Sequence, residues 1–217
     1  MVRNELIKKI KEETLHYIGI PYWKNAIKDG VIVKSGIFGG KGTCEQIAAK
    51  TIELAQKQKI DLLKLTPQQI YNFQKKNKLG IDCSGLTSNL LNLILKLNKI
   101  EFQINPFKTS AKTLTSPEFS QKIKDYDQIQ TGDIIRTDSG KHVIFIIEKI
   151  GNIISYVQSS QKTFTRGVHY GHIEIVNPKK SLKYQLWSDK TKDGKKYSSL
   201  FNTKNGDGIY RLNALEK

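Results

Sequence analysis

The sequence predicts an α+β fold, with helices in the first half of the chain and an antiparallel sheet in the second. Two observations carry this prediction. Apolar residues up to about position 97 recur at helical spacing behind helix-start signals, and later segments are short β-branched runs bounded by Gly, Asn and Pro. The chain has 217 residues, of which 38% are hydrophobic, enough for one compact core. We therefore expect a single domain over residues 1–217.

The first predicted element is an amphipathic helix at residues 4–18, where most apolar side chains fall on one face. Gly19 and Pro21 end it, because neither residue continues a helix readily. The glycine-rich segment 28–42 predicts a loop, with a short strand at 31–33.

Further helices are predicted from two Thr-x-x-Gln patterns, which are typical capping boxes. They place helices at about 43–59 and 66–76, the second with proline at its first helical position. A glycine-containing turn at 80–82 then leads into a strongly apolar helix that continues to about residue 97. Its apolar character predicts a central position in the fold.

The second half of the chain contains β-branched runs that predict strands. We expect these strands at 133–136, 142–148, 153–159, 172–176 and 208–212. The polar, lysine-rich segment between the last two is expected to form a long excursion at about 178–207.

Cys83 is the candidate nucleophile. The two cysteines cannot form a disulfide framework and lack the spacing of a zinc site. Cys83 opens a predicted helix behind Asp82, and the free N–H groups of a first helical turn favour a thiolate and can stabilise an oxyanion. Cys44 also follows a predicted N-cap, but no candidate base lies near it in the sequence, so we expect it to pack.

His142 is the candidate general base, because it opens a long apolar run that would hold its imidazole rigidly at the start of a strand. A predicted hairpin places Gln158 or Ser160 opposite it. Gln158 has the longer reach, and its amide oxygen can orient the imidazole. His169 remains the alternative for this third position.

Neither a metal nor a cofactor is expected. His169 and His172 are separated by two residues, but no cysteine lies nearby and acidic neighbours are few. The sequence also has no phosphate-binding glycine motif.

Three motifs, in this order along the chain, resemble those of the NlpC/P60 cell-wall peptidases. Residues 19–22 (Gly-Ile-Pro-Tyr) resemble the family's Gly-x-Pro-Tyr segment, and residues 82–85 (Asp-Cys-Ser-Gly) resemble its nucleophile motif. Residues 132–135 (Gly-Asp-Ile-Ile), followed by His142 and Val143, resemble the family's Gly-Asp strand and its His-Val element.

The resemblance implies a papain-like fold, with the nucleophile at the N-terminus of a central helix. It implies amide hydrolysis through a thioester, with Cys83 attacking, His142 transferring the proton and Gln158 orienting His142. Tyr22 would lie beside the active site and, with the side chains flanking Cys83 (Asp82 and Ser84), would contact substrate. The family's main substrates are peptidoglycan stem peptides, cleaved next to a D-glutamyl residue.

The chain departs from the family in three places. A helical insertion at about 28–78 precedes the nucleophile, Gln158 stands where histidine is commonest, and the excursion at 178–207 has no counterpart. These departures leave two alternatives: an amidase toxin or acyltransferase of the same superfamily, and a basic binding module on a non-catalytic hydrolase fold. The presence of both Cys83 and His142 favours an enzyme.

The net charge of +16 predicts attraction to polyanions such as wall polymer or nucleic acid. No lysine pair adjoins Cys83 or His142 in the sequence, so we expect the charge to retain the enzyme on an anionic matrix rather than to take part in chemistry. No membrane span and no secretory signal are predicted. The location is left open: a cytoplasmic location, export by another route, or a signal trimmed from this chain is consistent with this sequence.

Overall fold

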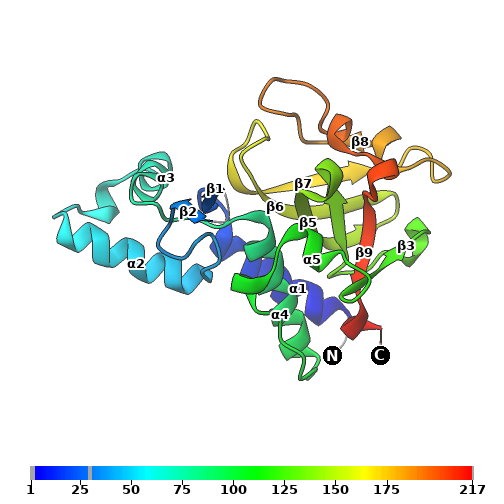
Figure 1. Cartoon of the computed structure of the whole chain (residues 1–217), viewed down its shortest axis with the longest axis horizontal. Helices are drawn as coiled ribbons and strands as arrows, with labels where there is room; N and C mark the ends of the chain where they lie inside the picture. The colour runs from blue at the N-terminus through cyan, green and yellow to red at the C-terminus, as the bar shows by residue number, and fades with distance from the viewer. Residues whose placement is uncertain (1–2, 29–30, 217) are drawn as a thin grey trace.

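The structure is a computed structural model that describes residues 3–28 and 31–216. The first two residues of the chain, residues 29–30 of the predicted insertion and the last residue lie outside this part. The fold is α+β, as predicted, and the described residues form five α-helices and a seven-stranded antiparallel sheet (Figure 1).

The helices begin where the sequence signals predict. Each capping-box threonine accepts a hydrogen bond from the third helical N–H, and the glutamine side chain accepts one from the threonine N–H in return. A short helix that the sequence did not predict follows the central one. The helices are α1 (Arg3–Tyr17), α2 (Cys44–Lys57), α3 (Pro67–Lys76), α4 (Cys83–Leu97) and α5 (Ala111–Leu114).

The sheet has the strand order β3-β9-β4-β5-β6-β7-β8. Five of its strands were predicted, and the two edge strands β3 and β8 were not. A separate two-stranded ribbon of β1 (Ala26–Lys28) and β2 (Val31–Lys34) includes the predicted short strand. The sheet strands are β3 (Ser120–Ile123), β4 (Ile134–Thr137), β5 (His142–Ile150), β6 (Ile153–Ser160), β7 (Gly167–Glu174), β8 (Leu186–Trp187) and β9 (Gly208–Leu212).

Strand β7 begins at Gly167, five residues before its predicted start at 172. Its first half contains glycine, histidine and tyrosine, so β-branched residues alone did not reveal it. Every residue of β6 from Ile153 to Ser160 pairs with β7. Pairing with a neighbouring strand therefore decides this boundary, because strand formation depends strongly on tertiary context.

One face of the sheet packs against α1 and α4. Alternate residues of β5, including Val143 and Phe145, are fully buried there against Leu86 and Leu90 of α4. Helix α2 joins this core through Ile47, while the rest of α2 and α3 extends away from the sheet (Figure 1). None of the described helices is long and apolar enough to cross a membrane.

The lysine-rich excursion covers the opposite face of the sheet. Its residues Leu182, Tyr197 and Phe201 are buried and pack on a second apolar cluster that includes Ile144. The Trp187 ring packs against neighbouring aromatic rings, with its centroid 5.5 Å from that of Tyr197 and 6.5 Å from that of Phe201. This segment contains the edge strand β8 and short helical turns between its loops, and its apolar residues form part of the core.

We predict that Phe201→Ala will lower the free energy of unfolding by about 3 kcal/mol, because truncating a buried aromatic leaves a cavity. Phe164→Ala is the matched control, since this ring is 79% exposed in the nearby β6–β7 loop. Urea denaturation of both variants measures the difference. Equal, small losses would show that the excursion is not part of the core.

Candidate active site

Cys83 is the first residue of α4 and lies in a turn that is fixed from several sides. Asp82 caps the helix by accepting a hydrogen bond from the Gly85 N–H at 2.7 Å. The Ser159 hydroxyl donates to the Ile81 carbonyl at 2.6 Å and ties the turn to β6. A Cβ atom at Gly85 would lie 2.2 Å from the Gly40 carbonyl oxygen, so only glycine permits this close approach.

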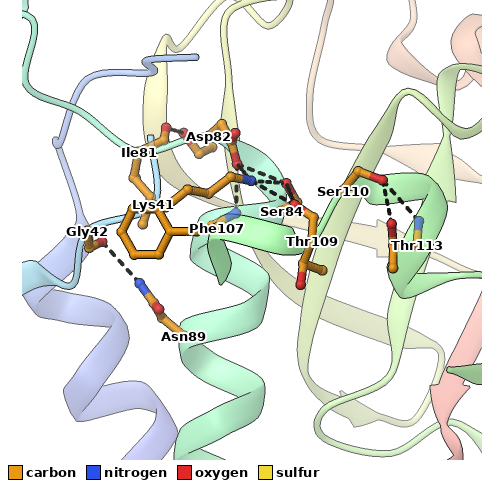
Figure 2. A network of polar contacts seen from close by, with 12 residues as sticks. Lys41, Gly42, Ile81, Asp82, Ser84, Asn89, Phe107, Thr109, Ser110 and Thr113 are labelled. Carbon is orange, nitrogen blue, oxygen red and sulfur yellow. Dashed lines mark hydrogen bonds and ion pairs between the residues drawn. The ribbon is translucent and has the colours of Figure 1, made fainter. Parts of the chain in front are cut away.

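A lysine from the insertion holds the acidic cap in place (Figure 2). Lys41 Nζ lies 2.9 Å from Asp82 Oδ1 and also donates to Ser84 Oγ and to the Thr109 carbonyl. Both charged side chains are largely buried, with 12% of Lys41 and 6% of Asp82 exposed. Since a buried carboxylate is stable only when paired and hydrogen-bonded, Lys41 is needed for the capped turn.

The side chains of Asp82 and Ser84, predicted to bind substrate, are buried in this network. Their hydrogen bonds hold the turn that carries Cys83, called the nucleophile turn below, in place. Their polar atoms are engaged in this network, so the predicted substrate contacts of these two side chains stay a prediction.

The electrostatics of Cys83 differ from the sequence expectation of a stabilised thiolate. Burial, followed by the charge of Asp82, raises the pKa of the Cys83 thiol to about 11, against the lowering effects of the Val143 N–H, Lys41 and the Ser84 N–H. The helix N-terminus does favour the thiolate, but desolvation outweighs it. Cys83 and Val143 belong to the same buried cluster, so the start of α4 packs near the start of β5.

His142 is buried at the first position of β5, and its Nε2 lies 2.8 Å from Gln158 Oε1. The Gln158 amide nitrogen donates to Asp189 Oδ2 at 2.5 Å, and Tyr197 donates its hydroxyl to Gln158 Oε1 at 3.2 Å. These partners fix the Gln158 oxygen as the group that faces His142. The neutral imidazole therefore carries its proton on Nε2 and keeps Nδ1 as a base.

Burial lowers the pKa of His142 to about 4, despite the opposing effect of its hydrogen bond to Gln158. The thiol and the imidazole are thus both neutral at pH 7. A neutral pair of this kind needs proton transfer from Cys83 to His142 during attack, rather than an ion pair formed beforehand.

Asp189 lies behind Gln158 and was not predicted from the sequence. It accepts hydrogen bonds from Gln158 and, at 2.7 Å, from the Tyr156 hydroxyl. Burial acts to raise the pKa of Asp189, but hydrogen bonds and charge from His169, with further donors, hold it below its usual range. Asp189 comes from the excursion, where no local pattern distinguishes it from other polar residues.

His169, the alternative third residue, faces Asp189 instead of His142. Its Nε2 lies 3.4 Å from Asp189, and its Nδ1 lies 3.0 Å from the Gly167 carbonyl oxygen. His172 is three positions along the same strand and so points to the other face of the sheet. The structure therefore brings Gln158, and not His169, to the ring of His142.

A second buried carboxylate shapes the turn before His142. Asp207 accepts hydrogen bonds from the N–H groups of Ser139 and Gly140 at 3.0 and 3.1 Å. Ser139 has a φ of 56° and Gly140 a φ of 80°, both in the left-handed region. Asp207 thus stabilises a strained turn that sets the start of β5.

Tyr22 lies beside the nucleophile turn, as the resemblance implies. It forms a parallel bridge with Ile81, and the Trp23 N–H donates to the Ile81 carbonyl at 3.3 Å. Burial, followed by the charges of Cys83 and Asp82, raises the pKa of the Tyr22 hydroxyl well above its usual value. Tyr22 also lines a pocket of about 720 Å³ at the surface.

Cys44, the other thiol, packs at the start of α2 and donates to Glu13 Oε1 at 3.3 Å. Burial, followed by Glu45 and Glu13, raises its pKa to about 12. Its nearest titratable neighbours are the carboxylates of Glu13 and Glu45, and its side chain is buried, which agrees with a packing role.

Comparison with protein-family models, with curated proteins and with solved structures finds no match to this chain. The function must therefore be argued from the site itself and from the sequence motifs.

We predict that Asp189→Asn will loosen the orientation of His142, because the Gln158 amide loses the anion that fixes its direction. Imidazole ¹⁵N shifts should change from a single Nε2–H tautomer to a mixture. Stability should fall by about 2 kcal/mol through unpaired buried donors. Asp193→Asn, an exposed change on the same segment, is the control, and an unchanged His142 tautomer in Asp189→Asn would contradict the assignment.

Proposed function

We propose that the chain is a papain-like cysteine hydrolase of the NlpC/P60 type that cleaves an amide bond in peptidoglycan stem peptides. The observation that carries the proposal is the placement of His142. Its Nε2 is held by Gln158, and Nδ1 remains as a base at the start of β5, a strand that packs in the same buried cluster as Cys83.

The proposed reaction has two acyl-transfer steps. Cys83 Sγ attacks the amide carbonyl while its proton moves to His142 Nδ1, and the oxyanion is held by backbone N–H groups at the start of α4. The intermediate then collapses: the C–N bond breaks, and His142 returns the proton to the leaving amine. Water, deprotonated by His142, attacks the thioester and releases the carboxylic acid and the free thiol.

The architecture supports the same reading. A cysteine at the first position of a buried helix, packed against the antiparallel strand that His142 begins, is the arrangement implied by a papain-like fold. The polar third residue on the adjacent strand also agrees with the motif order in the sequence. An amidase effector or an acyltransferase of the same superfamily would use the same three residues on another amide.

The proposal is tested by incubating the protein with purified muropeptides and following products by mass spectrometry. Hydrolysis should give two fragments whose masses sum to that of the substrate plus water. Cys83→Ala and His142→Ala should each lower the rate by at least about a thousandfold, as for other nucleophile–base pairs. Cys44→Ala is the matched thiol control and should remain active.

Other products would separate the alternatives. Fragments joined to an added amine, without gain of water, would indicate an acyltransferase. Binding of nucleic acid with no turnover of any muropeptide would overturn the hydrolase proposal in favour of a binding module.

The pH dependence gives an independent prediction. Only neutral His142 accepts a proton, and burial lowers its pKa to about 4, so the ring stays neutral from pH 7 down to about that value. The value of kcat/KM should therefore be retained at pH 5.5 and be lost as the pH falls through about 4. Circular dichroism at each pH controls for unfolding. Loss of activity centred near 6.5 would show that the ring is solvated and not buried.

A further inference from the structure

A basic pocket opens beside the nucleophile turn. Its volume of about 720 Å³ lies in the range of pockets that hold ligands. Its walls come from four segments that are distant in the sequence: Tyr22, helix α3, the β6–β7 loop and the excursion. These segments converge on the side of the sheet that faces α3 (Figure 1).

The charge of this lining is strongly one-sided. Asp193 is the single acidic residue among the lining side chains, and the basic ones are Lys75, Lys162, Arg166, Lys192 and Lys195. Lys162 pairs with Asp138 at 2.5 Å, whereas the other four basic side chains form no ion pair with residues 3–28 or 31–216. Because like charges in one hollow repel each other, this arrangement is complementary to a bound anion.

Two residues that line the pocket contact the segments that precede the candidate catalytic residues. Tyr22 is bridged to Ile81, two positions before Cys83. Lys162 reaches Asp138, in the turn that precedes His142. A substrate whose amide lies at Cys83 therefore has room to extend into this pocket.

We propose that the pocket binds an acidic segment of the peptide substrate, with carboxylates paired to Lys75, Lys192 and Lys195. The inference rests on the proposed function and deepens it, because it assigns selectivity for acidic over neutral peptides to the insertion and the excursion. Lysines suit this role as flexible point charges that do not require the planar geometry of a single carboxylate partner. A confined pocket beside an amide-cleaving thiol favours a peptide over an extended nucleic acid strand.

The binding test uses the Cys83→Ala protein, so that no chemistry intervenes. Fluorescein-labelled hexaglutamate is titrated and followed by anisotropy, with hexaglutamine as the neutral probe. Replacing Lys75, Lys192 and Lys195 together by glutamine should weaken hexaglutamate binding by about tenfold or more, since each exposed pair contributes modestly. Binding should also weaken as salt rises, because exposed charges are screened over about 8 Å at physiological ionic strength.

The matched control replaces Lys57, Lys96 and Lys183 by glutamine, three exposed lysines outside the pocket. It has the same net charge as the pocket variant and should keep hexaglutamate binding. Equal weakening in both variants would overturn the proposal, because general surface charge would then be sufficient. Tighter binding of a dT12 oligonucleotide through the same three lysines would overturn it in favour of nucleic acid.

A kinetic measurement separates this inference from the proposed function. The active protein is given muropeptides with free carboxylates and the same muropeptides with their carboxylates amidated. The ratio of the two kcat/KM values should fall about tenfold in the pocket variant and stay constant in the control variant. Cys83-dependent hydrolysis with an unchanged ratio would overturn the pocket alone, whereas pocket-dependent hexaglutamate binding without hydrolysis of any peptide would support the pocket and overturn the hydrolase.

Discussion

The hydrogen-bonded chain from His142 through Gln158 to Asp189 is the interaction on which the candidate site depends. It joins β5 to the excursion through two hydrogen bonds, His142 Nε2 to Gln158 Oε1 at 2.8 Å and Gln158 Nε2 to Asp189 Oδ2 at 2.5 Å. While ionised, Asp189 can accept hydrogen bonds but cannot donate them. It therefore binds the NH₂ end of the Gln158 amide and leaves the oxygen facing His142. That direction in turn fixes the tautomer of the imidazole. A carboxylate that does not touch His142 thereby decides which ring nitrogen is left without a proton.

The turn that carries Cys83 depends on a charged side chain from outside the three sequence motifs. Lys41, from the insertion, neutralises the Asp82 cap inside the turn that carries Cys83. Replacing only one partner of such a buried pair would leave an uncompensated charge, at a cost of several kcal/mol. The insertion and the excursion each contribute one residue to the support of a catalytic candidate. Both segments are therefore integral to the site, although neither contains one of its three motifs.

Charge is distributed in opposite ways inside and outside this site. Within it, burial raises the pKa of Cys83 and lowers that of His142, which keeps both groups neutral at pH 7. In the adjacent pocket, by contrast, the lining lysines are exposed to solvent. The proton transfer that we propose would thus occur in a desolvated interior, while the positive charge at the surface would attract the proposed anionic groups. The sequence did not reveal this pocket, since Lys75 and Lys195 are 120 positions apart and come together only in the fold.

The sequence by itself determined the features whose signals are local. Capping patterns set the starts of α2 and α3, the apolar run set α4 with Cys83 at its first position, and β-branched runs set most strands of the sheet. Alternation along the predicted hairpin placed Gln158 or Ser160 opposite His142, and the longer reach of Gln158 favoured the residue that the structure shows there.

Only the tertiary structure decided the features that depend on partners distant in the chain. The full extent of β7 follows from pairing with β6, and the role of the excursion follows from apolar residues that bury against the far face of the sheet. The protonation of Cys83 could not be predicted either, because the favourable helix N-terminus is a local property whereas desolvation depends on everything packed around the thiol. Lys41, Asp189 and the basic pocket were hidden for the same reason: single polar residues acquire a role only when folding places an opposite charge, or several like charges, beside them.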